Sequence, residues 1–284
     1  PVSGVKILYA PIGFDFTSDI TASINSELYE EAQKWNEMTD EIYFWIYSAN
    51  FYYYLAPYLN VDGMQSYYRF AKSAGAKWIF DQAQHDNTFA TGFGNLKSYL
   101  ASKLAWDAES DIAALTDKFF NGYFGPASAK MRAFYNEFNA AYKNASGLHI
   151  TTSCQVQPKA EYWTKDALIG WVVDCASALD MIEPLKTTDS AAYETYRKHI
   201  VGERISVLYL LIELYRGEID AVTKNAYIET FKSDVLEAGV RYPRESGAQT
   251  FDDLYSSWGT ASAVAAVADL ANPSASVAVS GTVT

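Results

Sequence analysis

The sequence comprises 284 residues and carries a formal net charge of −12 at pH 7. A chain of this length buries a sizeable hydrophobic core, as one large domain or two modest ones. The acidic excess argues against binding to nucleic acid or to anionic membrane surfaces, because like charges repel. We find no apolar stretch long enough to cross a membrane and no export signal in the first residues, so we expect no membrane insertion. The two cysteines, Cys154 and Cys175, are too few for a disulfide framework or a zinc site. They could pair with each other, but each also suits burial as a small hydrophobe, and we favour free thiols.

Three short apolar runs near the start of the chain predict β-strands, over residues 5–10, 41–47 and 77–81. Helices are predicted between and after them, over 26–38, over 62–74 and over a third segment that ends near Asp107 and carries Leu96, Tyr99, Leu100 and Leu104 on one stripe. Strand–helix–strand units join parallel strands by right-handed crossovers, so the carboxyl ends of the three strands are expected on one side of the sheet.

From about residue 107 the apolar residues recur with the helical period almost throughout. The pattern predicts helices over 111–120, from the Gly125-Pro126 turn through Tyr142, and over 159–182, 191–216 and 225–237. The series Ile205, Leu208, Ile212 and Tyr215 is typical of the inner face of a helical bundle.

The alternation of strands and helices predicts an α/β fold class, the C-terminal portion of a TIM-type (β/α) barrel with about three βα units over residues 1–106. An all-α bundle over 107–271 follows, and the small, uncharged residues of 272–284 predict a linker or the start of a next module. A complete barrel needs eight units. The remaining strands therefore lie upstream in a longer parent protein, or the three strands form a small open sheet.

Ligands of parallel α/β folds bind beyond the carboxyl ends of the strands. The first strand is followed by Asp15 and Asp19, and the second by Ser48 and Asn50. The third end is the richest in polar groups and carries Asp81, Gln82, Gln84, His85, Asp86 and Asn87.

A pair of carboxylates is what glycoside hydrolysis requires, one to protonate the leaving oxygen and one to attack or to activate water. Asp81 is a candidate for one of them, with Asp15 or an upstream carboxylate as the other. The alternative is that Asp81 caps the next segment or accepts a hydrogen bond from a neighbouring backbone amide. Asn50, Gln82 and His85 are candidates for binding sugar hydroxyls.

Aromatic residues make up 15% of the chain, with 22 Tyr and 7 Trp. Such rings fill protein cores, and they also stack on the apolar faces of sugars. Trp45, Tyr47 and Trp78 are candidates for sugar stacking. Trp45 and Tyr47 share one face of the second strand, because side chains alternate, but the sequence does not tell whether this face meets the helices or the barrel interior.

His85 beside Asp86 invites a Ser-His-Asp or a metal hypothesis, but the motifs that accompany such sites are missing. We find no Gly-x-Ser-x-Gly, no His-x-x-x-His and no Cys-x-x-Cys in the sequence. The Gly92-Phe-Gly94 segment has neither a strand before it nor the Lys of a phosphate-binding loop. We therefore expect no metal and no cofactor.

The runs Ile42–Tyr47 with Asn50-Phe51, Gly75–Gln82, Leu96–Asp107 and Phe119–Ala127 resemble the family called DUF4838. The resemblance covers about residues 5–260 and is most specific from Gly75 to Ala127. It implies a bacterial protein with a glycoside-hydrolase-like TIM barrel followed by helices, distantly related to α-glucuronidase-type enzymes. Members of this family of unknown function occur in large, often secreted proteins beside carbohydrate-binding modules. The sequence departs from the family pattern at Ile46, where an acidic residue is frequent, and at Asp81, where Glu is frequent.

The resemblance and the candidate residues together imply part of a secreted carbohydrate-active protein, extracellular or periplasmic, that hydrolyses or binds a glycan. Its partners are then carbohydrate, the upstream barrel strands and downstream modules of the parent protein. One alternative is a non-catalytic carbohydrate-binding or cell-surface module, in which Asp81 only accepts hydrogen bonds. Another is a scaffold segment whose working surface is the helical region.

Overall fold

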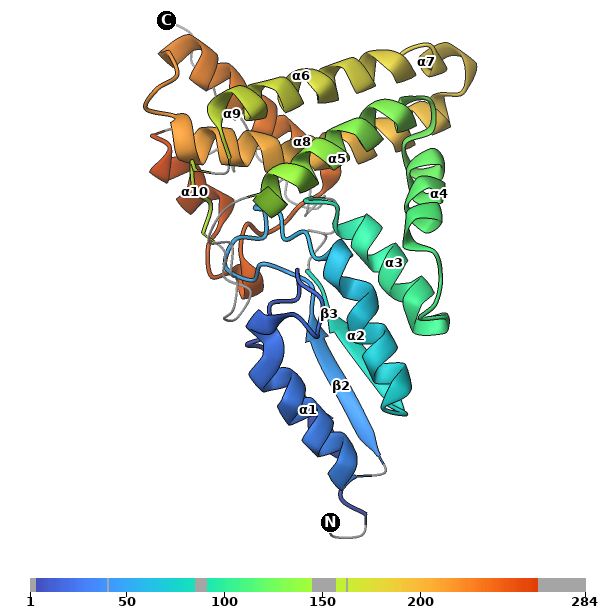
Figure 1. The fold of residues 1–284 in the computed structure, drawn as a ribbon. Helices are drawn as coiled ribbons and strands as arrows, with labels where there is room; N and C mark the ends of the chain where they lie inside the picture. Colours follow the sequence, from blue (N-terminus) through green and yellow to red (C-terminus); the bar gives the residue numbers. More distant parts are fainter. Residues whose placement is uncertain (1–3, 40, 85–90, 145–156, 162, 260–284) are drawn as a thin grey trace, which may run out of the picture.

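The computed structural model of the protein describes residues 4–39, 41–84, 91–144, 157–161 and 163–259. An α/β part at the N-terminal end leads into a broader helical part, and the carboxyl ends of the strands point toward the helices (Figure 1). This arrangement of βα units followed by helices confirms the predicted fold class. No helix in the described ranges is both long enough and apolar enough to span a membrane.

The sheet contains three parallel strands in the order β1-β2-β3, namely β1 (Ile7–Tyr9), β2 (Ile42–Tyr47) and β3 (Trp78–Gln82). Phe44 pairs with Tyr9 on one side and with Ile79 on the other, and Tyr47 pairs with Gln82. Strand order therefore follows chain order, and within the described ranges β3 has a strand neighbour on one side only.

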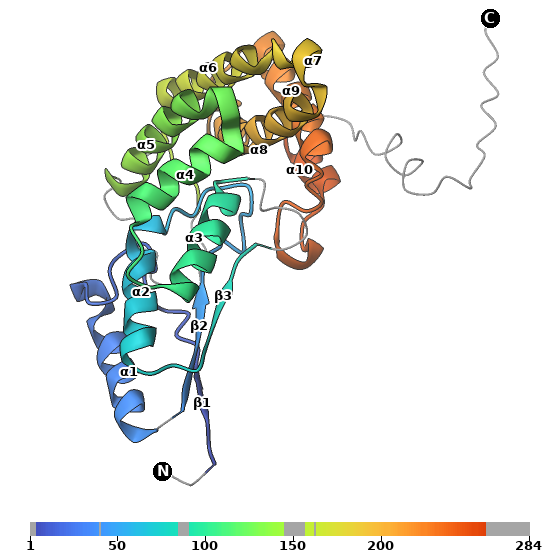
Figure 2. The same ribbon diagram turned by 90° about the vertical axis from the view of Figure 1, so that its right-hand side faces the viewer.

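Three helices, α1 (Ser26–Met38), α2 (Val61–Ser73) and α3 (Gly94–Trp106), cover the same face of this sheet (Figure 2). The Tyr9 hydroxyl donates to the Leu28 carbonyl of α1 (2.9 Å), and the ring of Phe44 packs edge-on against Phe70 of α2 (5.5 Å between centroids). Because side chains alternate along a strand, Tyr43, Trp45 and Tyr47 point to the other face.

No helix of the described residues covers that other face (Figure 2), and we call Tyr43, Trp45, Trp78 and Phe80 the open aromatic face. The exposed fractions of Trp78 and Phe80 are 46% and 38%. The Trp78 and Phe80 rings stack at 5.7 Å, and Phe80 meets Trp45 edge-on at 5.0 Å. Parallel sheets are normally covered on both faces, so this uncovered face is unusual for the fold.

Beyond α3 the chain is helical, with α8 (Ser190–Tyr215) at the centre of the bundle, packed against α6 and α9. Nearly every residue of α8 from Ile200 to Ile212 is buried, as expected for a helix surrounded by others. Cys175 of α6 lies buried as a free thiol. The other elements are α4 (Ile112–Phe124), α5 (Ser128–Asn144), α6 (Lys165–Ile182), α7 (Leu185–Thr188), α9 (Ala221–Ala238) and α10 (Phe251–Ser257), with short 3-10 turns at Ser23–Asn25, Gly125–Ala127 and Glu245–Gly247.

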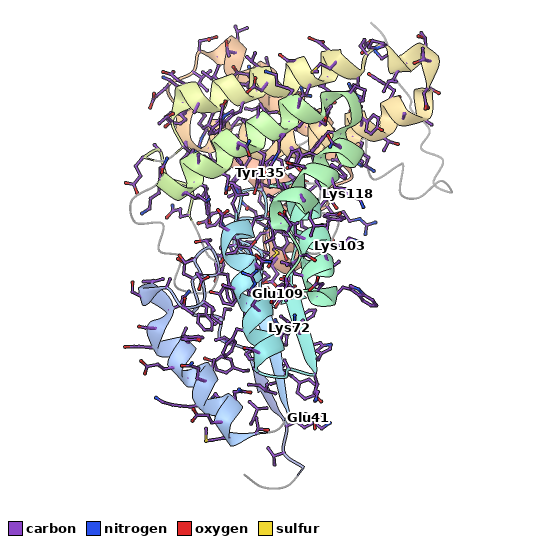
Figure 3. The ribbon with its side chains drawn as sticks, turned by 45° about the vertical axis from the view of Figure 1, so that its right-hand side comes forward. Glu41, Lys72, Lys103, Glu109, Lys118 and Tyr135 are labelled. Atoms are coloured by element: carbon purple, nitrogen blue, oxygen red, sulfur yellow. The ribbon has the colours of Figure 1, made fainter. Side chains whose placement is uncertain are left out.

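Ion pairs on the surface connect α2 to the segment after α3. The Glu109 carboxylate contacts the Arg69 guanidinium at 2.8 Å and the Lys72 ammonium at 3.8 Å, and Figure 3 shows Lys72 and Glu109 side by side. These groups are about half exposed, so the pairs contribute about 0 to 1 kcal/mol each. The core, and not this network, holds the α/β part together.

The predicted helices differ from the observed ones mainly at their ends. The helix predicted over 111–120 continues through Asn121-Gly122 to Phe124 and ends at Gly125, which has φ +52°. The helix predicted from 159 begins only at Lys165. The short helices α7 and α10 were not predicted, although Thr250 and Asp253 form a capping box at the start of α10. Residues 272–284 lie outside the described ranges.

Two helical glycines allow a matched test of the packing between α2 and the loop after β1. A Cβ atom at Gly63 would lie 2.5 Å from the carbonyl oxygens of Phe16 and Ser18, whereas one at Gly122 in α4 meets nothing within 4 Å. We predict that Gly63→Ala lowers the free energy of unfolding by about 1 to 3 kcal/mol, because backbone must move. Gly122→Ala should raise it by about 0.5 to 1 kcal/mol. Urea unfolding measures both changes, and equal effects of the two substitutions would contradict this packing.

Candidate functional site

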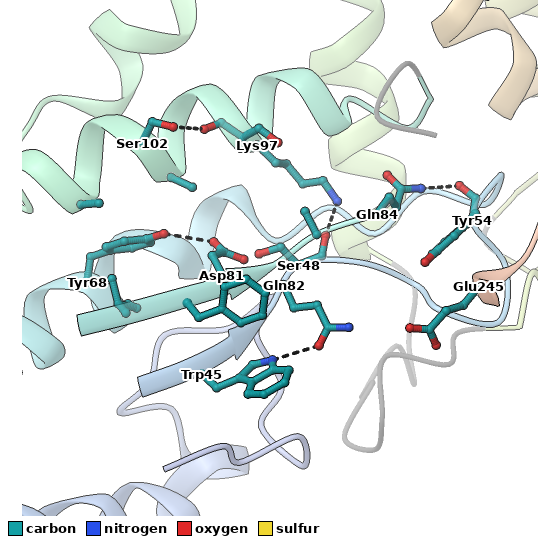
Figure 4. Close-up of a pocket in the computed structure, with 16 residues that line it drawn as sticks. Trp45, Ser48, Tyr54, Tyr68, Asp81, Gln82, Gln84, Lys97, Ser102 and Glu245 are labelled. Carbon is teal, nitrogen blue, oxygen red and sulfur yellow. Dashed lines mark hydrogen bonds between the residues drawn. The ribbon is translucent and has the colours of Figure 1, made fainter. Parts of the chain in front are cut away.

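A pocket of about 640 Å³ lies at the carboxyl ends of β2 and β3, and we call it the β3 pocket (Figure 4). Its wall combines β2 and β3 with α2, α3 and the loop between α9 and α10. The side chains that argue for function are Trp45, Ser48, Tyr68, Asp81, Gln82, Lys97 and Glu245.

Asp81 and Gln82 lie on opposite faces of β3, and both line the pocket. Asp81 points toward the helices, where its Oδ2 accepts a hydrogen bond from the Tyr68 hydroxyl of α2 (3.1 Å). Gln82 points toward the open aromatic face, where its Oε1 accepts from the Trp45 indole Nε1 (2.9 Å). Among the described residues β3 is an edge strand, and the pocket is lined by side chains from both of its faces.

The Asp81 carboxyl group is in an unusual environment. Its Oδ1 is shielded from solvent and accepts no hydrogen bond from the residues that the structure describes. Burial raises the pKa of Asp81 above its ordinary value, while the neighbouring Ser48 and Tyr68 hydroxyls and the Lys97 ammonium oppose this rise. A carboxyl group of this kind holds its proton to a higher pH than an exposed one and is suited to donate it.

Lys97 of α3 is a buried cation that connects the helix to the segment after β2. Its Nζ donates to the Ser48 carbonyl (2.6 Å) and to the Tyr58 carbonyl (2.9 Å), and lies 5.6 Å from the centroid of the Tyr58 ring. The Asn60 amide nitrogen in turn donates to the Ser48 hydroxyl (2.9 Å). These bonds fix Ser48 at the pocket wall.

A second buried carboxyl group, that of Glu203 in α8, holds the start of α3. Its Oε2 accepts from the Phe93 backbone N–H (2.8 Å), and Phe93 has a left-handed backbone with φ +57°, which is uncommon for a residue other than glycine. Burial raises the pKa of Glu203 to about 8, against the effects of the Phe93 N–H and the Lys97 charge. The helical bundle thus fixes the position from which Lys97 is presented.

Glu245 brings a further carboxylate to the β3 pocket from far along the chain. Its backbone N–H donates to the Phe51 carbonyl (3.1 Å), and the Tyr54 N–H donates to the Pro243 carbonyl (3.1 Å). Figure 4 shows the Glu245 carboxylate on the side of the pocket toward which the Gln82 amide nitrogen points. The sequence contains no local signal for this placement, because it depends on how two loops dock.

The structure places the predicted carboxylates differently. Asp81 lines the β3 pocket, whereas Asp15 does not. Asp15 is buried, and its carboxylate is occupied by its own loop: Oδ1 accepts from the Thr17 N–H (3.0 Å) and hydroxyl (2.6 Å), and Oδ2 from the Ser18 hydroxyl (2.8 Å). The structure thus does not bring Asp15 to Asp81, and the loop hydrogen bonds give Asp15 a structural role.

Only some of the predicted substrate-binding residues line the β3 pocket. Trp45 and Gln82 line the β3 pocket together. Tyr47 and Asn50 are buried beside it, with Tyr47 stacked on Trp45 (6.1 Å). Trp78 lines a smaller pocket of about 450 Å³ at the other end of β3, and His85 lies outside the described residues.

No group of three or more His, Cys, Asp or Glu side chains that could hold a metal ion occurs in the described part of the chain. The residues of the β3 pocket instead offer hydrogen-bonding groups, an indole and two carboxyl groups. Such a site can bind a polar ligand with flat apolar faces and transfer protons to it.

Comparison with known proteins agrees with the resemblance over the first half of the chain. Residues 2–137 match the model of a family described as "Domain of unknown function (DUF4838)". This stretch is a DUF4838 domain. No curated protein and no solved structure matches the chain. The DUF4838 match contains all three strands and Asp81, Gln82 and Lys97, and it ends within α5, so Glu203 and Glu245 lie beyond it.

We predict that Glu203 makes stability depend on pH. Its pKa of about 8 in the folded state exceeds the ordinary value, so its contribution is fully present in acid and is lost as the pH rises through about 8. Glu203→Gln keeps an oxygen acceptor for the Phe93 N–H but does not titrate. The free energy of unfolding should therefore fall less steeply in this variant than in the wild type between about pH 5 and about pH 8.5.

Urea unfolding at several pH values measures the difference, with Glu194→Gln, an exposed position on the same helix, as the control. The same pH dependence in the wild type and in Glu203→Gln would contradict a raised pKa.

Proposed function

We propose that the chain is part of a carbohydrate-active, glycoside-hydrolase-like protein, and that the β3 pocket binds a glycan. The observation that carries this proposal is the hydrogen bond from Trp45 to Gln82 (2.9 Å), which fixes an indole and an amide in the wall of the pocket that the Asp81 carboxyl group also lines.

The aromatic side of the pocket suits a sugar ring. The Trp45 indole is held by Gln82 through its nitrogen and by the edge-on ring of Phe80 (5.0 Å), so its orientation is set before a ligand arrives. A preoriented indole offers a flat apolar surface to the C–H groups of a sugar. The Gln82 oxygen is occupied by Trp45, and Figure 4 shows the Gln82 amide nitrogen turned toward Glu245, where it is placed to donate to a hydroxyl.

The carboxyl side of the pocket suits acid catalysis. Hydrolysis of a glycosidic bond needs a group that gives a proton to the leaving oxygen, and the raised pKa of Asp81 favours the protonated form. Acid–base chemistry of this type needs no cofactor. We further propose that the parent protein works outside the cytoplasm, where polymeric glycans occur.

The open aromatic face supports a second candidate function, an interaction surface for other strands of a larger protein. Leu8, Trp78 and Phe80 are 51%, 46% and 38% exposed on that side of the sheet, and one edge of β3 pairs with no strand of the described residues. Exposed apolar surface and open strand edges are typical of contact sites for polypeptide. In this case Asp81 is only a hydrogen-bond acceptor, and the β3 pocket has no glycan ligand.

Two substitutions test the proposal. Trp45→Ala should lower the affinity for the bound glycan at least about tenfold, since loss of one stacking contact of about 1.4 kcal/mol has this effect. Asp81→Asn should keep the affinity within a few-fold but lower the hydrolysis rate by about 100-fold to 10,000-fold, because the amide cannot donate the proton of an acid. Calorimetric titration with a panel of neutral oligosaccharides and release of reducing ends are the measurements.

Trp106→Ala is the matched control, because Trp106 is 93% exposed and does not line the β3 pocket. Equal affinity of Trp45→Ala and Trp106→Ala would reject the glycan site. Binding without hydrolysis in the wild type would restrict the function to glycan binding, and absence of both would favour the interaction surface.

A further inference from the structure

The loop between α9 and α10 presents Glu245 to the β3 pocket, on the side where Gln82 directs its amide nitrogen (Figure 4). We infer that Glu245 is the second functional carboxylate of this pocket and contacts the glycan opposite Asp81. The inference rests on the proposed function. It extends the functional unit beyond the DUF4838 match, which ends at residue 137, into the helical region.

Three consecutive residues fasten this loop to the segment after β2. The Pro243 carbonyl accepts from the Tyr54 N–H, and the Glu245 N–H donates to the Phe51 carbonyl, both at 3.1 Å. Between them, the Arg244 guanidinium lies 4.0 Å from the centroid of the Tyr52 ring. Backbone hydrogen bonds at Pro243 and Glu245 and the side-chain contact of Arg244 between them fix the position of the Glu245 backbone.

The backbone directly after Glu245 is in an unfavourable conformation. Ser246 has φ +56°, a left-handed geometry that residues with a side chain rarely adopt. The Glu245 carbonyl closes the turn by accepting from the Ala248 N–H (3.1 Å). Such strain persists only where the surroundings impose it, and it is common at functional sites. Here it accompanies a half-buried carboxylate that faces a pocket instead of open solvent.

The surroundings of the two carboxyl groups differ, which suits two different roles. Asp81 lies on β3, with a shielded Oδ1 and the Tyr68 hydroxyl donating to Oδ2, whereas Glu245 lies on the loop between α9 and α10. Pairs of carboxyl groups in unlike environments divide the acid and base roles of glycoside hydrolysis.

In the reaction that we infer, Asp81 gives its proton to the glycosidic oxygen, and the bond from that oxygen to the anomeric carbon breaks. Glu245 takes a proton from a water molecule, whose oxygen forms the new bond to the same carbon. One water is consumed; Glu245 then releases its proton to solvent and Asp81 takes one up, which restores both carboxyl groups.

The test compares Glu245→Gln with Glu194→Gln, a substitution of an exposed glutamate in α8, in the full chain. We expect Glu245→Gln to keep the circular dichroism spectrum and melting temperature of the wild type, and to lower the hydrolysis rate at least about 100-fold. The acidic limb of the pH–rate profile should disappear, because that limb reports deprotonation of the base. The fold-change in affinity for the oligosaccharide should be smaller than the fold-change in the hydrolysis rate.

The inference would be overturned if Glu245→Gln and Glu194→Gln showed the same hydrolysis rate, the same pH–rate profile and the same affinity for the oligosaccharide. If Trp45→Ala weakens binding in that case, the glycan site stands and only the role of Glu245 falls. If the wild type and all variants lack binding, the proposed function fails, and the role of Glu245 fails with it. A melting temperature lowered in Glu245→Gln but restored in Glu245→Asp, with the rate unaffected in both, would assign Glu245 a purely structural role and also overturn the inference.

Discussion

The buried ammonium group of Lys97 is the interaction on which the site depends. It donates to the carbonyls of Ser48 and Tyr58, so a side chain of α3 fixes both ends of the segment between β2 and α2. A neutral apolar replacement would leave two buried carbonyls without this donor, which costs more than the lost bonds alone. The same segment carries Phe51 and Tyr54, whose backbones hold the loop of Glu245. Through this segment, one cation in the α/β part determines where a carboxylate of the helical part is presented.

The charge of Lys97 also acts on the carboxyl groups around it. It opposes the rise in pKa that burial causes at Asp81 and at Glu203. Glu203 in turn accepts the Phe93 N–H at the start of α3, so the bundle positions the helix that carries Lys97. The α/β part and the bundle are therefore joined by a polar network in the interior, and not only by apolar packing.

The covering of one sheet face by α1, α2 and α3 explains both the core and the candidate site. Tyr9 and Phe44 are buried against the helices, while alternation along the strands leaves Trp45, Trp78 and Phe80 on the open side. A parallel sheet covered on one face exposes apolar rings that water does not stabilise. A ligand or a neighbouring segment must cover such rings to remove this cost, which is why a sugar and additional strands are the two candidates.

The sequence predicts the elements well because their patterns are local. The helix over 26–38 is observed with the same bounds, and the three predicted strands are observed side by side and parallel. The helix predicted to end at Asn121-Gly122 continues, since Gly122 meets no obstacle and the chain turns only at Gly125. Asp15 was open to a better prediction: Thr17 and Ser18 follow it closely, a pattern typical of a local turn in which the aspartate accepts their hydrogen bonds.

Other features of the site depend on tertiary structure and leave no local trace. Alternation places Asp81 and Gln82 on opposite faces, but that both reach one pocket follows from the position of β3 at the sheet edge. Glu245 reaches the same pocket because two loops dock through backbone hydrogen bonds. Such bonds do not depend on the identity of the side chains, so the sequence carries no sign of them. Sequence patterns therefore do not predict that the carboxyl groups of Asp81 and Glu245 line the same pocket.

A crystal structure of the full chain with a bound oligosaccharide tests the central claim most directly, since it shows which side chains contact the sugar. We predict a sugar ring stacked on the Trp45 indole, with hydroxyls on Gln82 and Glu245 and a glycosidic oxygen near the Asp81 carboxyl group. A sugar bound at a different place in the crystal, with the β3 pocket filled by water or by a strand of a neighbouring polypeptide, would contradict it.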